Sequence, residues 1–475
     1  MSFSSFIYVL AFLPAVVILC GLMRKLPFTK APQVFVLLAS VVFYGWAKIS
    51  FLPYLCGSIL VNWFMARQIA ARSYERRKPL LLLAVVLNLL FLGTFKYLDF
   101  FCSLLPLHSL GWQLPHLAFV LGISFFTITQ IMYLVDCYEE MIEPSSLFDH
   151  ATFVAFFPYV ISGPICRAGE IIEQLPRLNS PQGPSADTIA RAVYRFSIGL
   201  AKKVVLADSF AMAADIGFAN AAANATPQAW IYVCFYAFQL YFDFSGYSDM
   251  AIGSAMLLGI DLPNNFSAPL RSLSIIDFWR RWHITLSDFI TTYLYTPILR
   301  SFSKATLETA AVTTLLSMTI AGLWHGANWT FVLFGLMHGL GLVINQYWRK
   351  KKMPALPDPL CWLINFVWVV MAFVFFRAAN LEQALLYLRQ MFSPNVHLNF
   401  VPQLVAINGK TTMGVVALLA QIAGILICFL LPSSDVLSER FKTGWKSLSL
   451  TAFCLLLSFL FLNSNISKPF VYFGF

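Results

Sequence analysis

The first 25 residues contain an uncharged apolar stretch that is long enough to cross a lipid bilayer. Residues 3–23 carry no charged side chain, and about 20 helical residues at 1.5 Å each span a hydrocarbon core of roughly 30 Å. No basic residue precedes this stretch, whereas Arg24 and Lys25 follow it, which reverses the order of a cleaved signal peptide. We therefore expect a membrane anchor that begins outside the cytoplasm.

The whole chain has the composition of a membrane protein. Hydrophobic residues make up 59% and charged residues 11% of its 475 residues, against roughly 45–50% and 25% in soluble domains. This predicts an all-α polytopic protein with about 10–12 spanning helices, plus re-entrant and interfacial helices, in a single domain over residues 1–475. Nine scattered cysteines without a CxxC pair predict neither a disulfide framework nor a zinc site.

Basic residues gather in a few short segments, which predicts the orientation of the chain because cytoplasmic loops are enriched in lysine and arginine. This rule also explains the net charge of +10 without a nucleic-acid partner. The stretches 102–115 and 393–410 are poor in basic residues, so they and both termini are expected outside. The segments placed in the cytoplasm are Arg24 to Lys30, Arg67 to Lys78, Arg167 to Lys203, Arg271 to Arg281 and Arg349 to Lys352.

The segment FFPYVISGPICR, residues 156–167, breaks a hydrophobic run with Pro158, Gly163 and Pro164. Irregular backbone at membrane depth persists only where protein or a water-filled cavity satisfies its polar groups. The segment is therefore either a re-entrant hairpin that lines a cavity or a plain interfacial loop. Cys166 could in principle carry an acyl group, but no base is near it in the sequence.

Ionisable residues in apolar segments are candidates for function because burying them in a bilayer is costly. In residues 321–342, His325 and His338 are the only ionisable groups. On one continuous helix they would lie roughly 20 Å apart and about 140° around the axis, which disfavours a shared metal. Asn328 follows His325 by three residues, with Trp324 and Trp329 alongside. The Asn328 amide could thus fix the tautomer of the His325 imidazole, which would then be suited to act as a general base.

The alternative for His325 is a structural histidine that bridges helices, and we expect His338 to be mainly structural. Gly322 with Gly326 and Gly335 with Gly339 form small-xxx-small pairs that permit close helix packing.

A second candidate lies in SIIDFWRRWHITLSDF, residues 274–289. Ser274 and Asp277 predict a capped helix start. The next residues form an aromatic and cationic surface that could hold the phosphates of a nucleotide-bearing donor. An interfacial helix in lipid headgroups is the alternative. These residues are Trp279, Arg280, Arg281, Trp282 and His283.

Two carboxylates, Asp243 and Asp249, lie in the apolar stretch YFDFSGYSDMAIGS, residues 241–254, with Ser245 between them. Buried carboxylates usually pair with cations, and Arg280 or Arg281 are available. We expect a structural ion-pair or hydrogen-bond network rather than direct catalysis.

Taken together, these stretches resemble the membrane-bound O-acyltransferase family, specifically its alginate O-acetylase-like bacterial branch. They follow one another over nearly the whole chain, and only their combination is specific. The stretches are FKYLDFF (95–101), FFPYVISGPICR (156–167), YFDFSGYSDMAIG (241–253), DFWRRWHITLS (277–287), GLWHGANWTFVLFGLMHG (322–339), VFFRAAN (374–380) and KPFVYFGF (468–475). After the WRRWH helix, TTYLYTPILRSFSKA (291–305) lacks the charged pair and glycine turn of relatives, so donor docking or partner contact is expected to differ there.

The resemblance implies a helical core around a transmembrane tunnel, with the family histidines at His325 and His283. It implies no permanently bound cofactor: acetyl-CoA or another acyl thioester enters from the cytoplasm, and the acyl group passes to a periplasmic SGNH-like or alginate-acetylase-type partner. The acceptor is then an extracytoplasmic polysaccharide such as alginate or a related exopolysaccharide, and the location is the bacterial inner membrane. Trp324, Asn328 and His283 would position reactants or stabilise the oxyanion.

Other functions remain open at this point. D-alanyl or peptidoglycan O-acyl transfer occurs within the same family. A proton-coupled transporter would use the intramembrane histidines and aspartates as a relay, although such folds commonly carry internal repeats and none is evident. A structural scaffold for polysaccharide secretion is a third possibility.

Overall fold

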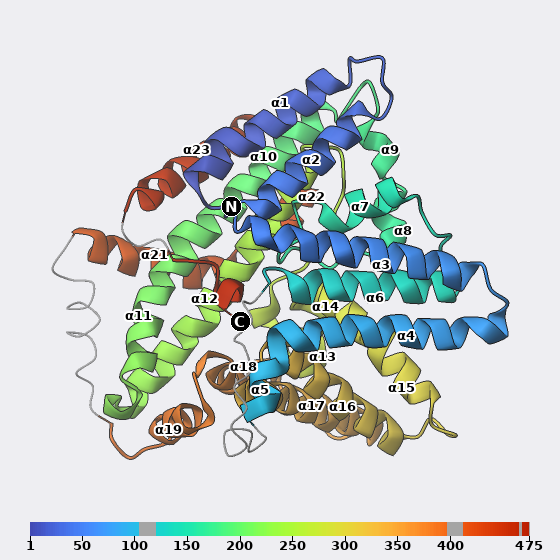
Figure 1. The fold of residues 1–475 in the computed structure, drawn as a ribbon. Helices are drawn as coiled ribbons and strands as arrows, with labels where there is room; N and C mark the ends of the chain where they lie inside the picture. Colours follow the sequence, from blue (N-terminus) through green and yellow to red (C-terminus); the bar gives the residue numbers. More distant parts are fainter. Residues whose placement is uncertain (104–119, 397–411, 465–467, 475) are drawn as a thin grey trace, which may run out of the picture. The chain divides into compact units, whose positions relative to one another are not determined.

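The computed structural model describes residues 1–103, 120–396, 412–464 and 468–474. These residues form helices joined by turns and short extended stretches (Figure 1), so the all-α prediction is confirmed. An isolated antiparallel bridge joins Phe266 and Trp282. Two compact units are present: unit 1 comprises Met1–Phe196 and Met250–Pro263, and unit 2 comprises Ser197–Asp249 and Asn264–Phe475. One domain over residues 1–475 stays a prediction.

Unit 1 contains the first part of the chain, and two long helices, α10 and α12, contribute residues to both units. The elements up to α10 are η1 (Ile7–Phe12), α1 (Leu13–Met23), α2 (Ala31–Gly45), η2 (Ile49–Phe51), α3 (Leu52–Ala70), α4 (Tyr74–Leu92), η3 (Gly93–Tyr97), α5 (Leu98–Ser103), α6 (Ile123–Tyr138), α7 (Leu147–Ala155), α8 (Ala168–Ile172), α9 (Leu175–Leu178) and α10 (Ala186–Ala201).

Unit 2 holds the remaining elements. They are η5 (Lys202–Ala207), α11 (Asp208–Ala219), η6 (Ala221–Ala223), α12 (Thr226–Met256), η7 (Pro269–Arg271), α13 (Ile275–Arg281), α14 (Ile284–Phe289), η8 (Ile290–Tyr295), α15 (Thr296–Arg300), α16 (Leu307–His325), α17 (Trp329–Lys350), α18 (Asp358–Arg377), α19 (Leu381–Met391), α21 (Thr412–Leu430), α22 (Ser434–Glu439), α23 (Trp445–Leu462) and η9 (Val471–Gly474).

Six helical segments in the described residues are long and apolar enough to span a membrane: Ile49–Ala70, Glu75–Cys102, Leu307–His325, Trp329–Lys350, Asp358–Arg377 and Trp445–Leu462. Four shorter apolar helices accompany them: Ile7–Met23, Ala31–Gly45, Ile123–Tyr138 and Val415–Leu430. The chain is therefore a multi-pass membrane protein. The exact number of crossings and the tunnel stay predictions, and the stretches expected outside, 102–115 and 393–410, lie mainly outside the described residues.

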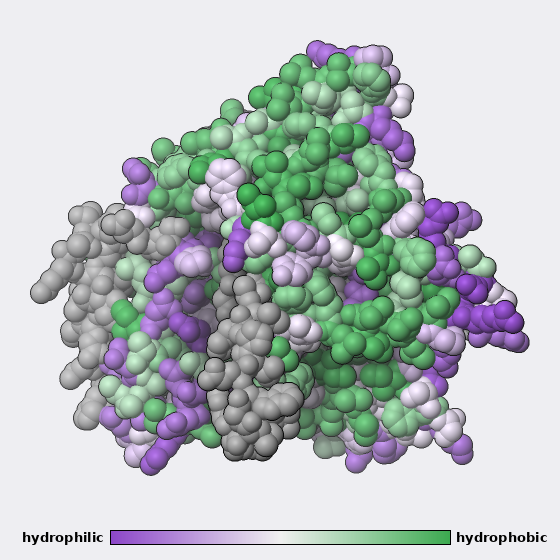
Figure 2. Space-filling model, in the orientation of Figure 1, coloured by the Kyte–Doolittle hydropathy of each residue, from purple (hydrophilic) through white to green (hydrophobic). Residues whose placement is uncertain are grey.

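The long helix α4 shows how this surface suits a bilayer. Its large apolar side chains are exposed, and hydrophobic residues cover it in Figure 2, whereas hydrophilic residues gather near its start. In water such a surface would aggregate, but in lipid it needs no protein partner. The exposed apolar residues of α4 are Leu82, Leu83, Val86, Leu87, Leu89 and Leu90.

The broken segment after α7 is packed inside unit 1. Residues 156–166 are buried and non-helical, and their backbone is partly satisfied from within: Gly163 N–H donates to the Tyr159 carbonyl at 3.1 Å. Phe157 N–H donates to the Ser40 hydroxyl on α2 at 3.1 Å. A plain interfacial loop is therefore wrong, because protein surrounds the irregular backbone.

The histidine-bearing stretch 321–342 is a helical hairpin, so the expected continuous helix is wrong. Helix α16 ends at His325, Gly326 is extended, and α17 begins at Trp329. The two helices pack closely at glycines: a Cβ on Gly322 would lie 2.7 Å from the Gly335 Cα. This contact confirms the prediction that glycines allow close approach here.

Candidate active site

The side chain of His325 sits at the C-terminal end of α16, inside unit 2, and is 6% exposed. Its surroundings are aromatic, so water has little access to the imidazole. The ring centroids of its neighbours lie at 5.0 Å for Trp324, 5.3 Å for Phe376, and 5.9 Å for both Phe334 and Tyr472.

Asn328 does not play the part expected of it beside His325. It is the N-cap of α17: its Oδ1 accepts from Thr330 N–H at 3.1 Å, and its Nδ2 donates to the Ala379 carbonyl at 2.9 Å. The amide thus fixes the helix start and ties it to the chain after α18. The predicted aromatic slot also differs, because Trp329 is 51% exposed.

His283, the second candidate histidine, is fully buried between α13 and α14 with a left-handed backbone, φ 43°. Its Nδ1 lies 3.1 Å from Asn265 Oδ1. Because an amide oxygen only accepts, Nδ1 carries the proton and Nε2 presents a lone pair. Within the described residues Nε2 has no hydrogen-bond partner. Burial lowers the pKa of His283 to about 3, so the ring is neutral at working pH.

Trp279 is placed by a third histidine, His338 on α17. Its indole N–H donates to His338 Nδ1 at 3.2 Å. His338 Nδ1 therefore accepts, and the ring proton sits on Nε2, which lacks an acceptor in the part of the chain that the structure describes. His338 was expected to be mainly structural, and it does join α17 to α13. Its buried, unused N–H also makes it a possible donor.

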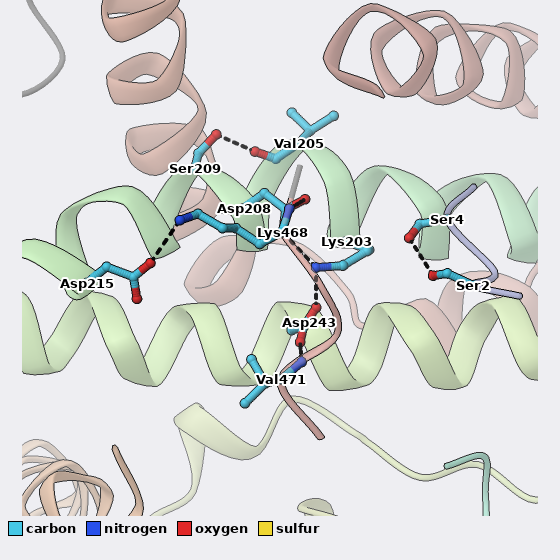
Figure 3. Close-up of polar contacts among 10 residues, drawn as sticks. All are labelled: Ser2, Ser4, Lys203, Val205, Asp208, Ser209, Asp215, Asp243, Lys468 and Val471. Atoms are coloured by element: carbon cyan, nitrogen blue, oxygen red, sulfur yellow. Dashed lines mark hydrogen bonds and ion pairs between the residues drawn. The ribbon is translucent and has the colours of Figure 1, made fainter. Parts of the chain in front are cut away.

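Asp243 and Asp249 on α12 form the expected ion-pair network, but with other partners. Asp243 pairs with Lys203 at 2.9 Å (Figure 3), and Asp249 pairs with Lys202 at 2.8 Å. Both lysines are buried in η5. The sequence predicts them at the end of a basic loop, so that prediction is wrong. Ser245 is buried, and its hydroxyl has no hydrogen-bond partner among the described residues.

Helix α13 begins as predicted, since Ser274 Oγ accepts from Asp277 N–H at 3.1 Å. The two arginines at the end of α13 lie in different surroundings. Arg281 is held by Asp277, with Nε 2.8 Å from Oδ1, whereas Arg280 is exposed.

A cavity of about 320 Å³ lies beside Arg280 in unit 2, bounded by α13, α14, η8, α16 and α17. Trp279, Met318 and Leu342 give it apolar walls. Trp282 does not line it; this indole is buried and stacks on Phe278 with centroids 5.5 Å apart. The cavity thus has one cation, Arg280, and one carboxylate, Asp288, beside apolar walls.

Sequence reasoning missed the C-terminal segment as part of the site. Tyr472 is buried against His325, and its ring centroid lies 4.4 Å from that of Phe244. Phe244 in turn meets His283 edge-on at 4.7 Å. The only sequence signal was the family-like ending KPFVYFGF, which gives no hint of where the segment packs.

Comparison with known proteins agrees with this picture. Residues 79–388 match the family model of the membrane-bound O-acyltransferases. A peptidoglycan O-acetyltransferase of Helicobacter pylori is 38% identical over 94% of this chain and 92% of its own. A probable alginate O-acetylase of Pseudomonas aeruginosa is 38% identical over 83% and 75%. A teichoic acid D-alanyltransferase of Streptococcus thermophilus is 31% identical over 49% and 58%.

Proposed function

Because the chain belongs to the membrane-bound O-acyltransferase family, we propose that this acyltransferase takes an acetyl group from a cytoplasmic thioester, acetyl-CoA or a related donor. The group ends on an extracytoplasmic polysaccharide. Two relatives that align with most of the chain are named for O-acetylation, of peptidoglycan and of alginate. D-alanyl transfer has weaker support, since its named relative aligns with half of the chain.

The chemistry is assigned to His325. Its imidazole takes the proton of an acceptor hydroxyl, and the oxygen attacks the thioester carbonyl carbon. A C–O bond forms, the C–S bond breaks, and the imidazolium returns its proton to the leaving thiolate. The observation that carries this assignment is the burial of His325 among aromatic rings at the end of α16. A dry site protects the thioester from hydrolysis, and a neutral imidazole suits general-base catalysis.

Other groups position the reactants. His283, held in one tautomer by Asn265, and Trp324 shape the reaction site. The cavity beside Arg280 takes the phosphate-bearing end of the donor. A periplasmic partner of the SGNH-like or alginate-acetylase type receives the acetyl group in this scheme. The protein then sits in the inner membrane with both termini periplasmic.

The test uses the purified full chain in proteoliposomes with radiolabelled acetyl-CoA. We expect His325→Ala to lower acetyl transfer by a factor of about 10² to 10⁴ while membrane insertion and thermal stability stay normal. Wild-type transfer rates in His325→Ala would refute the assignment of the base.

The acceptor is identified by offering alginate or peptidoglycan fragments together with a periplasmic acyltransferase of the SGNH-like or alginate-acetylase type. Peptidoglycan is the second candidate because its named relative covers 94% of this chain. Substrate-coupled proton flux without thioester cleavage would instead indicate the transporter. A structural scaffold for polysaccharide secretion predicts instead that His325→Ala has no phenotype.

A further inference from the structure

The C-terminal segment Lys468–Gly474 is attached to unit 2 through its backbone. Val471 N–H donates to Asp243 Oδ2 at 2.7 Å, and Lys468 N–H donates to Asp208 Oδ2 at 3.3 Å (Figure 3). The segment contains a single short helical turn, η9, and the N–H groups at the start of a helix have no acceptor within it, so its position depends on such external acceptors.

The two acceptors belong to one buried charge cluster. Lys203 Nζ lies 2.7 Å from Asp208 Oδ1 and 2.9 Å from Asp243 Oδ1, and the three side chains are 3%, 2% and 1% exposed. Lys203 reaches one oxygen of each carboxyl group, so the two other oxygens need donors from elsewhere. Buried anions require hydrogen-bond donors, and the tail supplies one N–H to each carboxylate. The tail therefore completes the cluster, and the cluster holds the tail.

A second attachment lies nearer the solvent. The Lys468 ammonium is 3.2 Å from Asp215 Oδ2, and Arg377 Nη2 is 2.8 Å from Asp215 Oδ1. These groups are partly exposed, so water screens the interaction and its contribution is small. The buried cluster is the main anchor.

The anchor determines what touches the candidate base. One residue after Val471, the ring of Tyr472 packs against His325 at 5.9 Å and against Phe376 at 6.1 Å. Phe470, one residue before, stacks on Tyr247 at 4.2 Å. Release of the Val471 hydrogen bond would therefore loosen the aromatic wall of His325.

We propose that Lys203, Asp208 and Asp243 form a positioning site that binds the C-terminal segment and holds Tyr472 against His325. The three residues act through the tail and do not touch the substrate. The positioning role rests on the proposed function of His325, whereas binding of the tail by the cluster does not.

Two readouts on the full chain separate these claims. Hydrogen–deuterium exchange of the C-terminal peptide reports the Lys468 and Val471 amides directly; in Val471→Pro, which has no N–H at 471, the Lys468 amide is the readout. Steady-state acetyl transfer gives kcat and the KM for acetyl-CoA. We expect Asp243→Ala to speed exchange of this peptide at least tenfold and to lower kcat at least tenfold with an unchanged KM. Asp243→Asn retains an acceptor oxygen and is expected to restore much of the protection and of kcat.

The chain offers a matched control and a milder variant. Asp249→Ala removes the carboxylate of the neighbouring buried pair with Lys202, on the same two elements, and is expected to leave tail exchange and kcat near wild type. Val471→Pro deletes the donor N–H while leaving Lys203, Asp208 and Asp243 in the chain, and Val471→Ala keeps the N–H. Val471→Pro should reproduce Asp243→Ala even if the latter folds poorly.

Unchanged tail exchange in Asp243→Ala and Val471→Pro would overturn the binding site. Fast exchange with unchanged kcat would overturn the positioning role. If Asp249→Ala also sped tail exchange and lowered kcat, both effects would reflect general destabilisation, and the proposed positioning site would be overturned. Retained transfer in His325→Ala with a released tail in Asp243→Ala would refute the proposed function alone.

Discussion

The close approach of α16 and α17 makes Gly322 a sensitive position. An added Cβ would lie 2.3 Å from the Phe331 carbonyl oxygen and 2.7 Å from the Gly335 Cα, and real Cβ contacts essentially never fall below 3.0 Å. Both obstacles are backbone atoms. Gly322→Ala must therefore move the helices apart by at least about 0.7 Å, an overpacking that costs about 1–3 kcal/mol.

The same shift reaches His325, one helical turn further along α16. A misplacement of roughly 1 Å can cost about 10²-fold in rate, so we expect Gly322→Ala to lose both stability and most acetyl transfer. The assay is thermal unfolding in detergent combined with transfer in proteoliposomes.

Gly57 on α3 provides the matched control, because nothing lies within 4 Å of its added Cβ. Gly57→Ala should gain up to about 1 kcal/mol from helix propensity. If Gly322→Ala unfolded at the wild-type temperature with full activity, the close packing of the hairpin and its coupling to the histidine would both be wrong.

Two further predictions concern single side chains. Arg280→Ala should raise the KM for acetyl-CoA at least about tenfold with little change in kcat. The KM for a donor without phosphates should be the same for wild type and Arg280→Ala. Arg281→Ala, which loses a cation already paired with Asp277, is the control variant. For His283, burial lowers the pKa from 6.5 to about 3, so the unfolded state binds the extra proton below pH 6.5. His283 then costs up to about 1.4 kcal/mol of stability per pH unit on acidification. The stability difference between wild type and His283→Gln should shift in favour of the variant from pH 7.5 to 5.5, and a constant difference would show that His283 is accessible to protons.

Apolar length was a good guide to the fold. The apolar runs of the sequence predict membrane helices near 31–47, 49–66 and 79–101, and the structure has helices at Ala31–Gly45, Ile49–Ala70 and Glu75–Cys102. Hydrophobicity cannot show a break inside an apolar run, however, and for this reason the sequence of residues 321–342 predicts one helix where the structure has two. The available signal was Asn328 before Trp329 and Thr330, since asparagine is a preferred N-cap.

Partners of charged residues could not be predicted because they depend on how helices cross. Lys202 and Lys203 looked like the end of a cytoplasmic basic segment, yet they lie in a π-helical segment facing Asp249 and Asp243. The sequence suggests Arg280 and Arg281 as partners of the two carboxylates, but the structure pairs both carboxylates with lysines. The role of the tail was invisible for the same reason, as Val471 and Asp243 are 228 residues apart.

The buried, non-helical segment 156–166 has a consequence for how the protein is made. A translocon releases segments sideways into lipid, and a stretch with free backbone N–H and C=O groups cannot enter lipid alone. Phe157 needs the hydroxyl of Ser40, which belongs to a helix synthesised more than 100 residues earlier. This part of the chain can therefore settle in the membrane only against the protein made before it, so an intact α2 is a condition for its insertion.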